Sequence, residues 1–185
     1  MADGDLGWAR RAVRSRFAQA ATVVGLWVPV FLIGMVVHES LHAVAVLALG
    51  SHPDLVMRPW PLALAPLSIT GIHVAPVPSL DATGQFLDNL MGPGIAATLF
   101  AVMAWRLAVG SLRLAVIATA LGLAFYAVIE PLDVVLDGRL ELSFLTTPEF
   151  NYGVPLLLAL IVAGASAGTK RPLIPAALSA APTST

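Results

Sequence analysis

The chain has 185 residues, of which 58% are hydrophobic and only 11% are charged, less than half the charged fraction of roughly 25% that is typical of soluble domains. With a mean hydropathy of +0.86 and 10 Lys+Arg against 11 Asp+Glu, the composition argues against a soluble enzyme, a disordered chain or a nucleic-acid-binding protein. The sequence contains no cysteine, which removes disulfides, thiolate metal ligands and cysteine nucleophiles. His, Asp, Glu, Ser and Thr are left to carry any site chemistry.

Four apolar runs predict an all-α membrane protein with about four transmembrane helices. They cover residues 17–50, 90–109, 112–136 and 154–168. The first run is well beyond the ~20 residues that a helix needs to cross a bilayer. We expect one membrane-embedded domain over residues 17–168, between a basic N-terminal segment, residues 1–16, and a flexible tail, residues 169–185.

The connection between the first two runs, residues 51–88, differs from the rest of the chain because proline recurs in it. The prolines are Pro53, Pro59, Pro61, Pro66, Pro76 and Pro78. Proline at this density excludes a continuous helix. Residues 67–70 and then 71–74 alternate apolar with polar side chains, as a short strand pair would. We therefore expect a short β-containing loop at the membrane surface.

Most basic residues fall on one side of the predicted spans. That side carries Arg10, Arg11, Arg14, Arg16, Arg106, Arg113, Lys170 and Arg171. Only Arg58 and Arg139 fall on the other side. Because Lys and Arg concentrate in cytoplasmic loops, this bias predicts that both termini are cytoplasmic. The Ala-, Val-, Leu- and Arg-rich composition further suggests a prokaryotic inner or plasma membrane.

An HExxH motif lies inside the first apolar run, as His38-Glu39-Ser40-Leu41-His42. Positions i and i+4 share one face of a helix, so His38 and His42 can direct two imidazoles at one metal ion. Glu39 is adjacent and can act as general base on a water that the metal activates. An unpaired carboxylate between two histidines in hydrocarbon would cost several kcal/mol, which favours a metal site over two unrelated surface histidines.

The third ligand is expected in the third run, because a catalytic zinc ion takes three protein ligands and one open position. Glu130, Asp133 and Asp137 are spaced i, i+3 and i+7 and therefore share one helical face. Counted from the cytoplasmic ends of their runs, Asp133 and Asp137 match the depths of His38 and His42. Asp137 is the first choice as ligand, with Asp133 and Glu130 as alternatives, since depth alone cannot separate them.

The second run begins near Asn89-Leu90-Met91-Gly92-Pro93, where glycine and proline permit a helix start and a close helix approach. The order HExxH, then Gly92-Pro93, then Asp137-Gly138 resembles the core of the site-2 protease family, the intramembrane zinc metalloproteases. The resemblance covers roughly residues 30–138, and HExxH is its most specific part. It implies that His38, His42 and Asp137 bind Zn²⁺ and that Glu39 is the catalytic base.

The resemblance implies an endopeptidase that cleaves a membrane protein or peptide within or near the bilayer. Segment 51–88 would then supply a strand edge for an unwound substrate, with His73 and residues 67–74 as possible substrate contacts. Two other functions stay open: a noncatalytic membrane protein that binds a metal, and a zinc hydrolase that acts on a lipid or a small amide. His52, like His73, has no partner at metal-ligand spacing and is expected to be a loop histidine.

Overall fold

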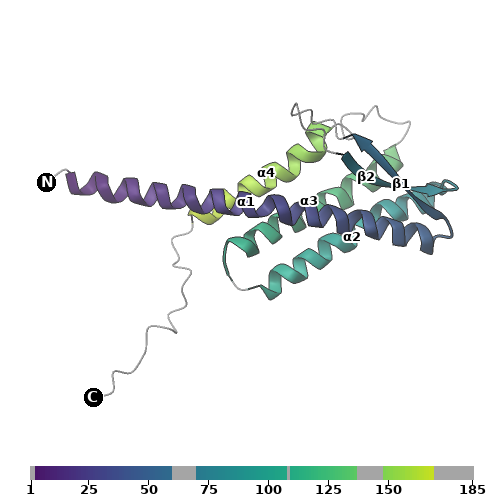
Figure 1. The fold of residues 1–185 in the computed structure, drawn as a ribbon, viewed down its shortest axis with the longest axis horizontal. Coiled ribbons are helices and arrows are strands. Elements are labelled where there is room, and N and C mark those ends of the chain that lie inside the picture. The colour runs from purple at the N-terminus through teal and green to yellow at the C-terminus, as the bar shows by residue number, and fades with distance from the viewer. Residues whose placement is uncertain (1–2, 60–69, 108, 137–147, 169–185) are drawn as a thin grey trace, which may run out of the picture.

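The computed structural model describes residues 3–59, 70–107, 109–136 and 148–168, which form four helices and one two-stranded sheet (Figure 1). The first helix, α1, runs over Asp3–Ala48 and is 46 residues long. It begins well before the predicted start at residue 17, because the basic N-terminal segment is rich in Ala and Arg, which are strong helix formers. α1 ends where Gly50 adopts a φ of 82°, a left-handed conformation that glycine reaches without steric cost.

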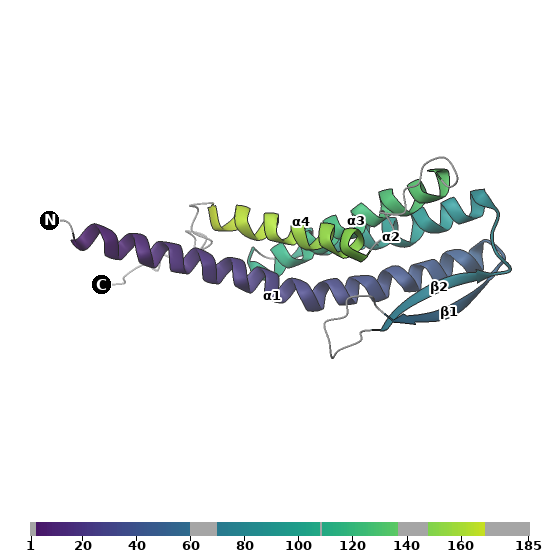
Figure 2. The same cartoon turned by 90° about the horizontal axis from the view of Figure 1, so that it is seen from above.

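The two strands that follow lie beside the C-terminal half of α1 (Figure 2). β1 covers His52–Pro59 and β2 covers Thr70–Val77, paired antiparallel with His52 opposite Val77 and Pro59 opposite Thr70. Strand structure in this connection was correctly expected, but the predicted pairing of residues 67–70 with 71–74 is wrong. The strand that contains residues 70–74 pairs instead with the segment directly after α1, and residues 67–69 lie outside the described part.

The register positions of the prolines explain how a proline-rich segment can form this sheet. Pro53, Pro59 and Pro76 occupy the same alternate register positions as Val74, and the Val74 N–H points away from β1 to the Glu39 carboxylate. At these positions a missing N–H removes no bond between the strands. A two-stranded sheet, in which each strand has one free edge, therefore accommodates all three.

The second and third helices form an antiparallel pair: α2 covers Ala82–Arg106 and α3 covers Ser111–Leu136. The start of α2 is set by Asp81, whose carboxylate accepts a hydrogen bond of 2.7 Å from the Gly84 N–H as an N-cap. The predicted start near residue 90 is therefore wrong by about two turns. Gly92 and Pro93 lie inside the helix rather than at its beginning.

Small residues bring α1, α3 and the fourth helix, α4 (Pro148–Gly168), close together. A Cβ at Gly34 would lie 2.8 Å from the Thr119 methyl group, and one at Gly122 would lie 3.2 Å from the Pro155 Cβ. Such contacts are the usual means of close helix packing where the surroundings are apolar. The Gly34 contact lies one turn before His38, so it brings α1 against α3 next to the HExxH motif.

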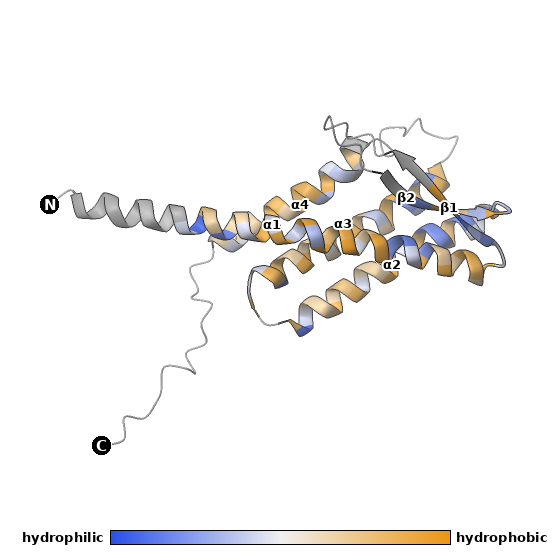
Figure 3. Cartoon of the chain, in the orientation of Figure 1, coloured by the Kyte–Doolittle hydropathy of each residue, from blue (hydrophilic) through white to orange (hydrophobic). Residues whose placement is uncertain are grey.

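Three of the described helices are long and apolar enough to cross a membrane, over Ser15–Ala48, Ala82–Arg106 and Ser111–Leu136. The apolar part of α4, Tyr152–Ala167, is shorter. Of the four expected spans, three are therefore supported by the described helices. Apolar residues colour most of the length of α2, α3 and α4, whereas polar residues gather near the strands and the start of α2 (Figure 3). The polar end of the bundle is where the HExxH motif lies.

Candidate metal centre

His38 and His42 lie one turn apart on α1 and face the interior of the bundle. Their exposed fractions are 1% and 7%, and the two Nε2 atoms are 2.8 Å apart. The spacing of the HExxH motif therefore does bring two imidazole nitrogens to one point. The His38 ring also stacks on Tyr126 of α3, with ring centroids 5.7 Å apart.

The carboxylate that joins this pair is Glu130 of α3. Its Oε1 lies 3.4 Å from the His38 Nε2, and its Oε2 lies 3.3 Å from the His42 Nε2. One ligand atom from each of these residues lies within 4.8 Å of the others, close enough to hold one metal ion. A tetrahedral zinc ion with ligands at about 2.0–2.1 Å would separate them by roughly 3.3 Å, so the donor set fits such an ion.

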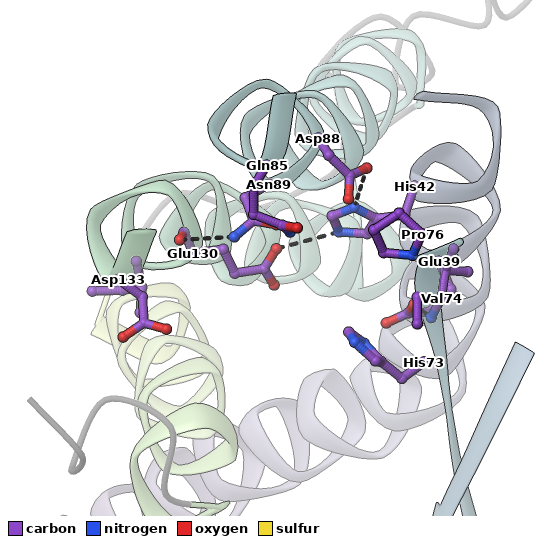
Figure 4. A pocket seen from close by; sticks show the side chains of 12 residues that line it. Glu39, His42, His73, Val74, Pro76, Gln85, Asp88, Asn89, Glu130 and Asp133 are labelled. Atoms are coloured by element: carbon purple, nitrogen blue, oxygen red, sulfur yellow. Dashed lines mark hydrogen bonds and ion pairs between the residues drawn. The ribbon is translucent and has the colours of Figure 1, made fainter. Parts of the chain in front are cut away.

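The other two carboxylates expected on the same face of α3 have different positions. Asp133 lines the neighbouring pocket and lies apart from the histidines (Figure 4); among the described residues it is not a member of the ligand group. Asp137, the first choice from the sequence, lies outside the described residues. Glu130, which was the last of the three alternatives, is the one beside the histidines.

Glu39 lies on the β2 side of the site, outside the group of three candidate ligands. Its Oε2 accepts a hydrogen bond of 3.1 Å from the Val74 N–H of β2, and Figure 4 shows it beside His73 and Val74. Glu39 and His42 line the same pocket. Helix α1 thus presents a candidate metal ligand, His42, and a carboxylate outside the ligand group, Glu39, to one space.

That space is a cavity of about 360 Å³ between α1, β2, α2 and α3. Its lining consists of Glu39, His42, His73, Val74, Ala75, Pro76, Gln85, Asp88, Asn89, Ile129, Glu130 and Asp133. His73, the substrate-contact candidate from the sequence, therefore lies in this lining. His52 is exposed, lies at the opposite end of the sheet register from Thr70 and is not in this lining.

Helix α2 contributes polar residues that the sequence analysis did not select. Asp88, 2% exposed, places its Oδ1 3.0 Å from the His42 Nδ1. Asn89 donates from Nδ2 to the Glu130 backbone carbonyl at 3.0 Å, and Gln85 donates to the Asn89 side-chain oxygen at 2.9 Å. The signal was present in the sequence, because residues spaced i, i+3 and i+4 share a helical face, but the predicted helix began only at residue 90.

Gly92 lies on the same face of α2, one turn after Asp88. A Cβ there would lie 2.6 Å from the His42 Nε2 and 2.7 Å from two other atoms of the ring, which is closer than any real Cβ contact. Only glycine at this position lets α2 pack directly on the Nε2 edge of the His42 ring. The close approach expected from the Gly92-Pro93 sequence is confirmed, although it occurs inside the helix.

The chain matches no protein-family model, no curated protein and no solved structure. Two buried imidazoles and a carboxylate can bind a divalent metal ion, and a second carboxylate borders the same cavity without belonging to the ligand set.

Proposed function

We propose that the chain is a membrane-embedded zinc-dependent endopeptidase that resembles the site-2 protease family. The observation that carries the proposal is that His38, His42 and Glu130 converge on one point beside a cavity that Glu39 also lines. Two histidines and one carboxylate, with room for a further ligand, are a donor set of catalytic zinc sites. Zinc bound there would polarise the scissile carbonyl and activate a water molecule.

Glu39 supplies the acid and base chemistry in this proposal. It takes a proton from the attacking water and delivers it to the amine that leaves, which is the usual work of the HExxH glutamate. Its place in the lining of the cavity supports this role, as does its position outside the ligand group. His38, His42 and Glu130 hold the metal, and none of them needs to transfer a proton.

The edge of β2 that is not paired with β1 supports a peptide as the substrate. On that edge Val74 donates its N–H to Glu39 and would exchange this partner for a substrate carbonyl, and residues 73–76 line the cavity. An extended peptide can add to such an edge through main-chain hydrogen bonds. A substrate helix must unwind before its peptide bonds are accessible, and the β2 edge offers the partner for the unwound strand.

The test is the Glu39→Gln variant, assayed beside the wild type in detergent on a mixed pool of single-span transmembrane peptides, with cleavage sites read by mass spectrometry. We expect zinc to copurify equally with both proteins and cleavage by the variant to be about 10²- to 10⁴-fold slower, the usual contribution of a general acid–base. Asp54→Asn, an exposed carboxylate change on β1, is the matched control and should cleave at the wild-type rate.

Two outcomes would contradict the endopeptidase proposal. Cleavage by Glu39→Gln at the wild-type rate would show that Glu39 is not the general base. A wild-type protein that binds zinc but cleaves no peptide would instead indicate a metal-binding protein or, if it hydrolyses phospholipid vesicles or small amides, a different zinc hydrolase.

A further inference from the structure

Asp88 is a buried acidic residue within a helix that is apolar enough to cross a membrane. It lies inside the Ala82–Arg106 stretch and is 2% exposed. An ionisable side chain in such surroundings is costly unless a partner compensates it. Its partner is the His42 Nδ1, 3.0 Å away, so the pair joins α2 to the HExxH motif.

The two nitrogens of His42 face different groups. Nε2 points toward the His38 Nε2 and the Glu130 Oε2, at 2.8 and 3.3 Å, whereas Nδ1 faces Asp88. An ionised carboxylate can only accept a hydrogen bond, so its partner nitrogen must carry the proton. In neutral His42 the proton then lies on Nδ1 and the lone pair of Nε2 points to the metal centre.

His38 has no equivalent support. Its Nδ1 is buried and has no hydrogen-bond partner among the described residues, and the ring rests instead on Tyr126. The two histidine ligands are therefore held by different means. Packing holds His38, and a hydrogen bond to Asp88 fixes His42.

The surroundings of Asp88 make it a fixed partner rather than a mobile one. The next residue, Asn89, is tied to the Glu130 carbonyl of α3 at 3.0 Å. One turn further on, Gly92 lets α2 contact the His42 ring directly. One face of α2 thus contacts two of the three proposed ligands: the side chain of His42 and the backbone carbonyl of Glu130.

We propose that Asp88 is a positioning residue of the metal centre, which fixes the tautomer and the orientation of His42 so that Nε2 faces the metal. This inference rests on the proposed metal site and does not depend on proteolysis. Partners of this kind on ligand histidines typically contribute 10- to 100-fold to metal affinity.

The test compares wild type with Asp88→Ala, Asp88→Asn and the exposed control Asp54→Asn. Zinc affinity is measured by competition with a chromophoric chelator, and the visible absorption of the Co²⁺ form reports the ligand geometry. Thermal unfolding of the metal-free proteins, followed by circular dichroism, reports the fold separately.

We expect Asp88→Ala to bind zinc about 10- to 100-fold more weakly and to show a changed Co²⁺ spectrum, while Asp54→Asn matches wild type in both. Asp88→Asn should show a smaller loss, because the amide oxygen can still accept the Nδ1 proton. If Asp88→Ala does not fold, the nearly isosteric Asp88→Asn decides the question.

Zinc affinity within twofold of wild type, with an unchanged Co²⁺ spectrum, in the folded Asp88 variants would overturn the inference. A change in melting temperature alone, without a change in either metal readout, would also overturn it, since it would show a purely structural ion pair. Failure of wild type to bind zinc would overturn both proposals. Intact zinc binding without peptide cleavage would overturn the endopeptidase proposal and leave the role of Asp88 standing.

Discussion

Gly92 and His42 show how a single missing side chain shapes the candidate metal centre. The His42 ring occupies the space where a Cβ of residue 92 would lie, and its far nitrogen is held by Asp88 at 3.0 Å. A larger residue at position 92 would displace the His42 ring. The ring would then lose either its hydrogen bond to Asp88 or its position beside His38 and Glu130. The smallest residue is therefore required by the site as well as by helix packing.

Gly92→Ala should consequently lower metal affinity. The added methyl group must displace the ring, and we expect zinc to bind about tenfold or more weakly, the loss typical of a disturbed ligand orientation. Gly94→Ala is the matched control, because its Cβ would meet only the Ala127 Cβ at 3.9 Å. Chelator competition on both variants measures the difference, and equal affinities would show that α2 adapts to the methyl group.

Glu130→Gln and Asp137→Asn separate the carboxylates that the sequence left open. We expect metal content to fall to near zero in the Glu130 variant, since an amide is a poor replacement for a carboxylate ligand, and to stay at the wild-type level in the Asp137 variant. Metal analysis of the purified proteins measures this. The reverse pattern would restore Asp137 as the third ligand.

At the scale of residues, the sequence predicted which side chains come together within one helix. It did not predict which side chains meet between two helices. The i, i+4 spacing was enough to place His38 and His42 together. The choice among Glu130, Asp133 and Asp137 depends on the rotation of α3 toward α1, which the contact of Gly34 with Thr119 helps to set. The residue spacing within α3 alone does not determine that rotation.

At the scale of elements, a hydrogen bond between Val74 and Glu39 couples strand β2 to helix α1. The Val74 N–H donates to the Glu39 carboxylate, while the Val74 side chain is 3% exposed. β2 therefore contacts the candidate base directly through its backbone. Val74 also fixes the position of β2 along the cavity, because it is buried there.

Val74→Pro tests this coupling, because it removes the N–H without removing a bond to β1. Proline is tolerated at such an outward-facing position. We expect peptide cleavage to fall by about 10- to 100-fold, as misplacement of a catalytic group does, with zinc content unchanged. Val74→Ala keeps the N–H and shortens the buried side chain, so it should cleave faster than Val74→Pro; similar rates for the two variants would rule out a role for the backbone contact.

The elements themselves were predicted unevenly, for physical reasons. Apolar runs gave the positions of the helices, since a helix that faces an apolar environment must be apolar over its length. The start of α2 was missed because residues 82–89 include the polar side chains that face the site, and these resemble a loop. The pairing of β1 with β2 was missed because the strand prediction rested on the apolar–polar alternation of residues 67–74, whereas β1 carries Pro53 and Pro59, which a free edge accepts.

At the scale of the whole molecule, helices α1, α2 and α3 alternate in direction (Figure 1), so the α2–α3 turn lies at the same end as the N-terminal half of α1. The sheet and the candidate metal centre lie at the other end. The distribution of Arg and Lys predicts that the α2–α3 turn is cytoplasmic.

The natural absence of cysteine allows this orientation to be tested without background labelling. In intact cells, Asp54→Cys on β1 should react with a membrane-impermeant thiol reagent, whereas Ser111→Cys at the start of α3 should react only after the membrane is permeabilised. Labelling of both positions, or of Ser111→Cys alone, in intact cells would contradict the predicted topology.

The length of α1 fixes how far from a membrane surface the metal centre can lie. The apolar stretch Ser15–Ala48 has 34 residues and is about 51 Å long at 1.5 Å per residue, against a hydrocarbon thickness of about 30 Å. Tilt or protrusion must absorb the excess. His42 and His38 lie six and ten residues before the end of α1 at Ala48, about 9 and 15 Å along its axis. With α1 across the bilayer and Ala48 at the surface, the site is thus no deeper than the midplane. In the endopeptidase proposal, water and the peptide bond to be cleaved would then reach it from the leaflet opposite the basic N-terminus.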